Sequence, residues 1–214
     1  MSDVKQHPFT PRAKPAFDPH EVTVIFVLGG PGVGKGTQCA RIVHDFHFVH
    51  YSAGDLLRAE QARPDSEFGE LIKTYIREGN IVPMEITVAL LKNAIHEEIN
   101  KTGIKRFLID GFPRKMDQAD KFENDVCPSK LVLFFDTTEE VMLKRLLKRG
   151  ETSGRDDDNI ESIRKRFRTF VETSMPVVEN YEQLGKVLRV DANRSIDEVY
   201  AEVRKRLEAA LTQE

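Results

Sequence analysis

The sequence predicts an α/β protein in which a doubly wound, five-stranded parallel sheet is flanked by helices. The first observation is that short β-branched and aromatic runs alternate with helix-length amphipathic stretches, as in right-handed βαβ crossovers. The second is that these runs are continuously apolar, which is typical of strands buried on both faces. The third is a glycine-rich segment that directly follows the first run and opens a helix. With 214 residues, the chain is long enough for one core with small insertions.

The expected elements follow in chain order. We predict strands over residues 22–28, 48–51, 107–109, 131–135 and 187–190. A first helix runs from the glycine-rich segment toward Phe46, and a later one begins at Thr137, whose hydroxyl would cap it together with Glu140. The apolar stripe of that later helix is Met142, Leu143, Leu146 and Leu147. The next helical stripe is Ile160, Ile163, Phe167, Phe170 and Val171. In this architecture, ligands bind beyond the carboxyl ends of the strands.

Composition excludes several classes of protein. Apolar residues make up 40% of the chain and charged residues 31%, which rules out wholesale disorder. The net charge of −3 does not indicate a nucleic-acid-binding surface, and no apolar run approaches the roughly 18 residues that span a bilayer. Cys39 and Cys127 lie far apart without metal-ligand spacing, which fits a reducing compartment. Cys39 is expected to be a small packed side chain.

The N-terminal segment differs from the rest of the chain. Residues 1–20 hold four prolines and only scattered apolar residues, so we predict a flexible extension there and one domain over residues 21–214. A mitochondrial transit peptide is the alternative, but Asp3 and Asp18 interrupt its positive charge and serine is scarce.

The glycine-rich segment has the composition and position of a phosphate-binding loop. Residues 29–37 read GGPGVGKGT, between the first strand and the first helix. Glycines let successive backbone N–H groups point inward at a polyphosphate, the helix N-terminus adds its dipole, and Lys35 adds a positive charge. A plain glycine turn is the alternative, which five glycines and a lysine in this context disfavour.

The residues around this loop also bear on Mg²⁺. The general motif has Ser or Thr directly after the lysine, but here Gly36 stands there and Thr37 follows. We therefore predict no direct protein ligand for Mg²⁺, which phosphates and water would hold. Asp110 ends the third strand, where it can accept from Mg²⁺-bound water or, alternatively, cap the following turn. No guanine-reading Asn-Lys-x-Asp motif is present, which disfavours a signalling GTPase.

Arginines recur at the ends of elements that the fold would bring to one edge of the sheet. They are Arg58, Arg114, Arg145, Arg149, Arg155 and Arg166. One arginine alone is usually a solvated charge, but a converging set matches the oxygens of a transferring phosphoryl group. An acceptor phosphate is already ionised near neutrality and needs no general base, and no Ser/His/Asp or Cys/His set is compelling. The pattern therefore favours transfer between two phosphate-bearing substrates.

Two further clusters are assigned structural roles. His44, His47 and His50 surround the end of the first helix, but their spacing does not suit a metal site once the helix gives way to a strand. We therefore assign no metal-ligating residues. Asp157 and Asp158 lie in a polar, glycine-containing segment typical of a mobile lid, and are expected to cap a helix or to pair with arginines.

These motifs together resemble one known family. Residues 29–37 (GGPGVGKGT), 110–114 (DGFPR) and 149–158 (RGETSGRDDD) resemble those of nucleoside monophosphate kinases of the adenylate kinase group, in the same order, and the similarity runs from Val22 to the C-terminus. Residues 52–58 (SAGDLLR), 79–83 (GNIVP) and 111–118 (GFPRKMDQ) are most similar to the UMP-CMP kinases of fungal type. The resemblance implies a P-loop kinase fold, with a small helical insertion over residues 52–82 that binds the monophosphate and a short lid over residues 149–159.

The resemblance also implies a role for each matching position. The ATP-binding residues would be Gly32, Val33, Gly34, Lys35, Gly36 and Thr37, together with Arg145 stacked on the adenine, Arg149, and the backbone near Arg194. The acceptor-binding residues would be Arg58, Asn80, Ile81, Val82, Gly111, Phe112, Pro113, Arg114, Arg155, Arg166 and the base-reading Gln118. The catalytic set would be Lys35, Asp110, Arg114, Arg149, Arg155 and Arg166, the last three converging on the phosphates when the lid closes. The side chains of Asn80 and Arg194 lie near turns and are alternatively exposed.

The implied activity is ATP-dependent phosphorylation of UMP and CMP in pyrimidine nucleotide biosynthesis, with Mg²⁺. Ala53 stands where adenylate kinases of this group carry threonine, and Gln118 where asparagine is common in pyrimidine-specific relatives. We expect UMP to be favoured, CMP accepted and some activity on AMP. The alternatives are an adenylate kinase and a non-catalytic ATP-binding module. We further expect a monomer in the cytoplasm and also the nucleus, with small-molecule nucleotides as partners, and neither nucleic acid nor membrane.

Overall fold

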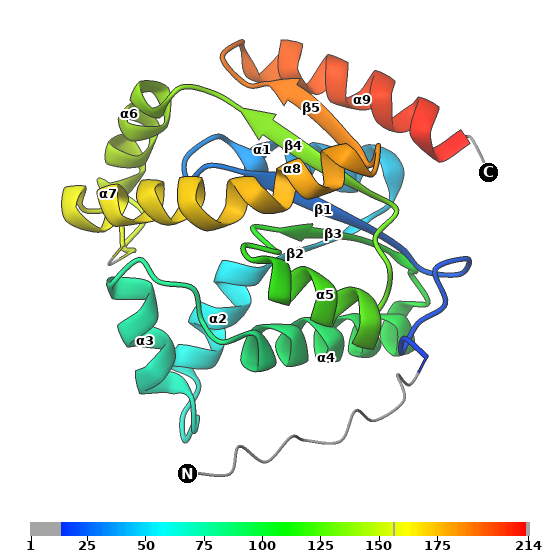
Figure 1. Ribbon diagram of the computed structural model, residues 1–214, viewed down its shortest axis with the longest axis horizontal. Coiled ribbons are helices and arrows are strands. Elements are labelled where there is room, and N and C mark those ends of the chain that lie inside the picture. The colour runs from blue at the N-terminus through cyan, green and yellow to red at the C-terminus, as the bar shows by residue number, and fades with distance from the viewer. Residues whose placement is uncertain (1–13, 156, 213–214) are drawn as a thin grey trace, which may run out of the picture.

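The computed structural model describes residues 14–155 and 157–212 (Figure 1). At its centre is a five-stranded, all-parallel sheet with the strand order β2-β3-β1-β4-β5. The strands are β1 (Thr23–Gly29), β2 (Val49–Ser52), β3 (Arg106–Asp110), β4 (Leu131–Asp136) and β5 (Val187–Asp191). Each predicted strand is present, with ends within one residue of those expected, and the fold class is confirmed.

Helices cover both faces of the sheet, as Figure 1 shows. One core cluster joins the sheet to α4 (Met84–Thr102), α5 (Met116–Asp125) and α8 (Met175–Gln183). The other cluster joins it to α1 (Lys35–Phe46) and α9 (Ile196–Thr212). In β1, Phe26 belongs to the first cluster and its neighbours Ile25 and Val27 to the second. Because side chains alternate along a strand, a strand covered on both sides is apolar throughout.

The remaining helices lie around the carboxyl ends of the strands. α2 (Ala53–Ala62), capped by Ser52, packs against α3 (Gly69–Arg77), and this pair shares a small core of its own with Leu57, Ile72 and Val82. α6 (Glu139–Gly150) and α7 (Ile160–Thr169) flank the polar segment 151–159, and α7 continues through a π-helical turn, η1 (Phe170–Ser174), into α8. Within the described chain, no helix combines the length and apolarity needed to cross a membrane.

Most of the predicted N-terminal extension, residues 1–13, lies outside the described residues. Its remainder, residues 14–20, lies against the domain. The backbone N–H groups of Ala16 and Phe17 donate to the carbonyls of Asp125 and Val126, at 3.2 and 2.9 Å. The Phe17 ring packs on the first core cluster.

The start of α6 differs from the prediction. Its cap is Thr138, whose hydroxyl accepts a hydrogen bond from the N–H of Val141, whereas the Thr137 hydroxyl donates to Asn193. The predicted cap was therefore wrong by one residue, because two adjacent threonines satisfy the same pattern. Leu147, predicted as buried, is exposed.

The stripe predicted for α7 is also partly wrong. Ile163 and Phe167 are buried, but Ile160 and Val171 are exposed. Ile160 is the first residue of the helix, and Val171 lies in η1, where the wider turn breaks the 3.6-residue period on which the stripe was based.

Candidate active site

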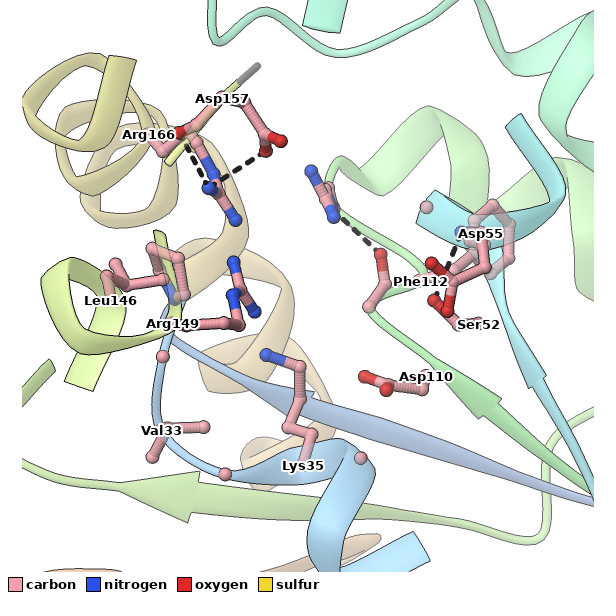
Figure 2. Close-up of a pocket in the computed structure, with 18 of the residues that line it drawn as sticks. Val33, Lys35, Ser52, Asp55, Asp110, Phe112, Leu146, Arg149, Asp157 and Arg166 are labelled. Carbon is pink, nitrogen blue, oxygen red and sulfur yellow. Dashed lines mark hydrogen bonds and ion pairs between the residues drawn. The ribbon is translucent and has the colours of Figure 1, made fainter. Parts of the chain in front are cut away.

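The carboxyl ends of the strands open into a cavity of about 720 Å³ (Figure 2). Its walls are the phosphate loop, α2, the loop after α3, the β3–α5 loop, α6, α7 and the β5–α9 loop. Every site residue predicted from the sequence lines this cavity except Pro113, which lines a smaller adjacent pocket. The fold thus brings residues from positions 32 to 194 around one space.

The phosphate loop requires glycine at two positions for different reasons. A Cβ on Gly32 would lie 2.7 Å from Cγ of Leu146 and 2.8 Å from the carbonyl oxygen of Met142, so only glycine lets the loop approach α6. Gly34 caps α1 with a φ of 105°, in the left-handed region that side chains disfavour. A Cβ on Gly34 or Gly36 would meet nothing within 4 Å, so the start of α1 faces open space. A phosphate fits there against the positive end of the helix dipole.

Two partly buried cations, Lys35 and Arg114, line the cavity near this loop. The ammonium of Lys35 donates to the carbonyls of Gly29 and Gly30, at 2.9 and 3.1 Å. Burial lowers the pKa of Lys35 to about 8, although the nearby charge of Asp110 opposes the shift. Figure 2 shows Lys35 and Asp110 projecting into the same space from α1 and β3. Burial, and then the charge of Arg166, lowers the pKa of Arg114 to about 10.

The cavity is strongly cationic although the chain as a whole is slightly acidic. Among the described residues, eight lysine or arginine side chains and three carboxylates line it. The cations are Lys35, Arg58, Arg114, Arg145, Arg149, Arg155, Arg166 and Arg194, and the acids are Asp55, Asp110 and Asp157. An anionic ligand would offset the cost of gathering these charges in a partly buried space.

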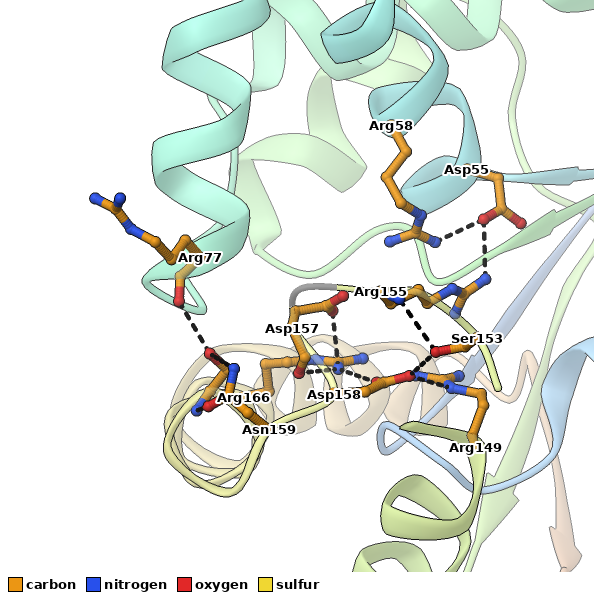
Figure 3. A network of polar contacts seen from close by, with 11 residues as sticks. Asp55, Arg58, Arg77, Arg149, Ser153, Arg155, Asp157, Asp158, Asn159 and Arg166 are labelled. Atoms are coloured by element: carbon orange, nitrogen blue, oxygen red, sulfur yellow. Dashed lines mark hydrogen bonds and ion pairs between the residues drawn. The ribbon is translucent and has the colours of Figure 1, made fainter. Parts of the chain in front are cut away.

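Carboxylates of the segment 151–159 hold two of the arginines (Figure 3). Arg149 binds Asp158 through two hydrogen bonds, of 2.8 and 2.6 Å. Arg166 lies 2.9 Å from the carboxylate of Asp157 and 3.3 Å from that of Asp158. Burial tends to raise the pKa of Asp158, but its hydrogen bonds with Arg149 lower it overall. The predicted pairing of these aspartates with arginines is confirmed, and the alternative that they cap α7 is wrong.

The cap of α7 is Asn159. Its side-chain oxygen accepts a hydrogen bond of 3.0 Å from the backbone N–H of Ser162. The asparagine directly before the helix therefore fulfils the capping role, which leaves the two preceding carboxylates for the arginines.

Arg155 connects the lid segment to α2 through a carboxylate that sequence reasoning missed. Its guanidinium donates to Oδ1 of Asp55 at 3.0 Å, and Arg58 donates to the same oxygen at 2.6 Å (Figure 3). The Asp55 side chain is 58% exposed. Partial desolvation tends to raise its pKa, but the bond with Arg58 leaves it lowered. Asp55 lies within the motif 52–58, which was the available signal, but its sequence position gives no indication of the partner 100 residues away.

Gln118 lies at the end of the cavity formed by α2, α4 and α5, with 3% of its surface exposed. Its Oε1 accepts a hydrogen bond of 2.8 Å from the N–H of Arg114, and its Nε2 donates to the carbonyl of Val82 at 3.4 Å. Backbone groups therefore fix the polarity of the amide. One hydrogen of Nε2 and one lone pair of Oε1 remain for a ligand. Thr87, a buried polar residue in an otherwise apolar face of α4, lines the same end and was also missed.

Arg145 lies at the other end of the cavity. Its guanidinium donates to the carbonyls of Val33 and Ala192, at 2.9 and 3.1 Å, and so bridges the phosphate loop and the β5–α9 loop. Arg194 donates to the carbonyl of Asp191 and pairs with Glu202. The cavity therefore has two ends, joined by the cations between them.

The three histidines are not brought together. His44 is exposed and contacts Asp45, and His47 is the C-cap of α1. His50 instead lines the cavity, with Nε2 3.3 Å from Oδ2 of Asp110.

A glycine-rich loop at a helix N-terminus, a buried lysine and arginines converging between two ends of one cavity define a P-loop protein built around the phosphates of its ligands. More specifically, the chain belongs to the adenylate kinase family: the family described as Adenylate kinase matches residues 27–186.

Curated relatives are similar over most of the chain. It is 61% identical to the uridylate kinase of Saccharomyces cerevisiae over 199 residues, which cover 93% of this chain and 97% of the relative. It is 63% identical over 192 residues to the UMP-CMP kinase of Lentinula edodes, covering 86% and 85%. The UMP-CMP kinase of Danio rerio is 53% identical over 189 residues, covering 86% and 96%.

Proposed function

We propose that this protein is a nucleoside monophosphate kinase, which transfers the γ-phosphoryl group of ATP to UMP and CMP and releases ADP with UDP or CDP. The observation that carries this proposal is the two-ended cavity, whose centre gathers the partly buried cations Lys35, Arg114 and Arg166. Two anionic substrates that meet in line would place their phosphates at that centre. The names of the relatives, uridylate kinase and UMP-CMP kinase, support the same substrates.

ATP would occupy the end next to the phosphate loop. Residues 32–37 would bind its phosphates, and Arg145 and the backbone near Arg194 would contact the adenine. The guanidinium of Arg145 is held by two carbonyls, so its orientation is set before a ligand arrives. Catalysis would come from this positioning and from charge compensation by Arg149 and Arg166.

The monophosphate would occupy the end beneath α2 and α3. Arg58 and Arg114 would hold its phosphate, while residues 80–82, 111–113 and Gln118 would surround the sugar and base. An acceptor phosphate is ionised near neutrality, so no side chain has to remove a proton. The segment 149–159 would act as the lid that excludes water, which prevents transfer of the phosphoryl group to water instead.

Mg²⁺ fits this site through Asp110. This carboxylate is buried at the end of β3 and lines the cavity, while Gly36 offers no side-chain ligand. Asp110 would therefore accept hydrogen bonds from water on the metal, and Mg²⁺ would neutralise charge on the transferring phosphates.

The polarity of Gln118 favours UMP over CMP. The spare hydrogen of its Nε2 suits the carbonyl oxygen O4 of uracil, whereas cytosine and adenine carry an amino group at the corresponding position. An amino group would instead have to donate to Oε1, which already accepts a hydrogen bond from the N–H of Arg114. We therefore propose the order UMP, then CMP, then AMP.

The test is a steady-state assay of ADP release by the purified full-length protein with ATP, Mg²⁺ and a panel of UMP, CMP and AMP. We expect the highest kcat/KM with UMP, a lower value with CMP and a small one with AMP. A tenfold preference for AMP would make the protein an adenylate kinase. ATP binding without any monophosphate-dependent ADP release would make it a non-catalytic module.

We also propose that the protein acts as a monomer in the cytoplasm and nucleus, in pyrimidine nucleotide biosynthesis. One copy of the chain already brings every residue assigned to ATP and monophosphate binding to the cavity or to the pocket beside it. Light scattering in solution and microscopy of the tagged protein test these two points.

A further inference from the structure

A cluster of three reactive side chains lies at the base of the cavity, beside the phosphate loop. Cys39, His50 and Asp110 each provide one ligand atom, and these atoms all lie within 4.8 Å of one another. Among residues 14–155 and 157–212, no other group of three His, Cys, Asp or Glu side chains is this close. The proposed kinase reaction uses only Asp110 of the three.

Three separate elements bring the cluster together. Cys39 is fully buried on the face of α1 that packs in the second core cluster, together with Leu108 of β3. Asp110 is two residues beyond Leu108, so both point to the same face of the sheet. In β2, Tyr51 packs in the first core cluster, so its neighbour His50 faces α1 as well. The alternation of side chains along β2 and β3, together with the packing of α1 on the same face of the sheet, therefore places the three side chains close together.

The donor atoms are a sulfur, an imidazole nitrogen and a carboxylate oxygen. We propose that Cys39, His50 and Asp110 form a binding site for one Zn²⁺ ion, with water as the fourth ligand. This mixture of donors suits Zn²⁺, whereas Mg²⁺ prefers oxygen ligands alone. Metal–ligand bonds of about 2.0–2.3 Å place tetrahedral donor atoms about 3.3–3.7 Å apart. Nε2 of His50 and Oδ2 of Asp110 already lie 3.3 Å apart, and the sulfur, within 4.8 Å of both atoms, has to come at most about 1.5 Å closer to each.

Two features weaken this site relative to a structural zinc site. The Cys39 thiol has to release its proton to solvent as the zinc–sulfur bond forms, and burial raises the pKa of that thiol. Lys35 is also close enough for its charge to interact with both Cys39 and Asp110. Zn²⁺ therefore binds reversibly, and the protein folds without it.

Bound Zn²⁺ inhibits phosphoryl transfer. His50 and Asp110 line the cavity, so the ion reaches the site from the substrate side. Its bond to Asp110 takes away the carboxylate proposed to hold water on Mg²⁺. The ion also adds positive charge next to Lys35, which displaces that ammonium from the phosphates.

The binding test uses Co²⁺ as a spectroscopic probe on the full-length protein without nucleotide. We expect one Co²⁺ per chain, a thiolate-to-cobalt charge-transfer band, and loss of that band when Zn²⁺ is added. Cys39→Ala should abolish the band, and Cys127→Ala should retain it. Cys127 is a matched control because it is also fully buried, but in the other core cluster. Absence of the band in the wild-type protein, or its persistence in Cys39→Ala, would overturn the proposal.

The functional test compares inhibition by Zn²⁺ at saturating Mg²⁺ and ATP. Zn²⁺ also binds nucleotide phosphates, so the relevant quantity is the difference between wild type and Cys39→Ala at the same free Zn²⁺. We expect wild type to be at least tenfold more sensitive, and Cys127→Ala to match wild type. Equal sensitivity of wild type and Cys39→Ala would contradict an inhibitory site.

A second pair of variants keeps the test independent of folding and of kinase activity. If Cys39→Ala melts at a lower temperature than wild type, Cys39→Ser replaces it, and it should bind Co²⁺ without the charge-transfer band. His50→Gln should weaken Co²⁺ binding at least tenfold, and unchanged affinity would remove His50 from the site. Because Co²⁺ binding is measured without substrates, its failure is distinguishable from a failure of the proposed kinase function.

Discussion

Lys35 shows how a single residue couples binding to protonation. Its ammonium donates to two carbonyl oxygens and forms no ion pair within the described chain. Burial lowers its pKa to about 8, because a buried charge loses its hydration. A bound polyphosphate would supply the missing opposite charge and raise this pKa again.

We therefore predict that ATP binding takes up protons near pH 8. At that pH, about half of the Lys35 side chains are neutral in the free protein, and binding favours the protonated form. The affinity for ATP should fall as the pH rises above about 8 and be nearly independent of this group below pH 7. Calorimetry in two buffers with different ionisation enthalpies measures the uptake, which should approach half a proton.

Lys35→Arg is the control for that prediction. A guanidinium remains protonated throughout this range, so the positive charge stays while the proton uptake disappears. Equal uptake by the variant and by wild type would assign the proton to another group.

At Gln118 we predict a change of acceptor preference rather than a loss of transfer. Gln118→Ala removes the amide hydrogen proposed to favour O4 of uracil, so the ratio of kcat/KM for UMP to that for CMP should fall toward one. The substitution also leaves the N–H of Arg114 without its acceptor. Both acceptors share that disturbance, so it cancels in the ratio. An unchanged ratio would remove Gln118 from base recognition.

At the scale of elements, the contact between the lid and α2 competes with the substrate. Asp55 occupies Arg58 and Arg155, two arginines proposed to bind phosphate. We predict that Asp55→Asn lets UMP bind about two- to fivefold more tightly, because a partly exposed ion pair contributes about 1 kcal/mol or less. Titration with UMP in the absence of ATP measures this.

Asp65→Asn is the matched control for Asp55→Asn. Asp65 is an exposed aspartate in the loop between α2 and α3, and it does not line the cavity. The substitution Asp65→Asn should therefore leave the affinity for UMP unchanged. Weaker binding of UMP by Asp55→Asn would mean that the bridge orients the arginines for substrate instead of competing with it.

The elements also show what local sequence can and cannot predict. Continuous apolar runs predicted all five strands to within one residue, because burial on both faces leaves a signature in consecutive residues. The cap of α6 was wrong because Thr137 and Thr138 are equivalent by pattern. The apolar stripe predicted for α7 was wrong where η1 begins, because no sequence pattern in residues 170–174 predicts a π-helical turn.

The site separates in the same way into predictable and unpredictable parts. The arginines that line the cavity follow strand ends or lie on flanking helices, so the topology alone places them near each other. Their carboxylate partners depend on loop conformation and on contacts between distant segments, as between Asp55 and Arg155. His50 was considered with its sequence neighbours, but its partners come from α1 and β3.

At the scale of the whole molecule, the excess of cations around the cavity is a cost to the ligand-free fold. We predict that Lys35→Met and Arg114→Met each raise the melting temperature of the ligand-free protein by about 2 to 4 °C, which corresponds to about 1 kcal/mol for a chain of this size. The same variants should lose about 10³-fold or more in turnover, as expected when a charge that contacts transferring phosphate is removed. Differential scanning calorimetry and the ADP-release assay measure the two quantities.

The predicted gain in stability and loss of activity need a control in which methionine replaces a lysine outside the cavity. Lys144→Met removes an exposed charge from α6 that does not line the cavity, and it should change neither melting temperature nor turnover appreciably. ATP should then stabilise wild type and Lys144→Met more than it stabilises Lys35→Met, because ligand binding adds to stability in proportion to its affinity. If Lys35→Met and Arg114→Met instead melted several degrees lower than wild type, these cations would stabilise the ligand-free fold. The excess of positive charge around the cavity would then be no argument for a site that binds two anionic substrates.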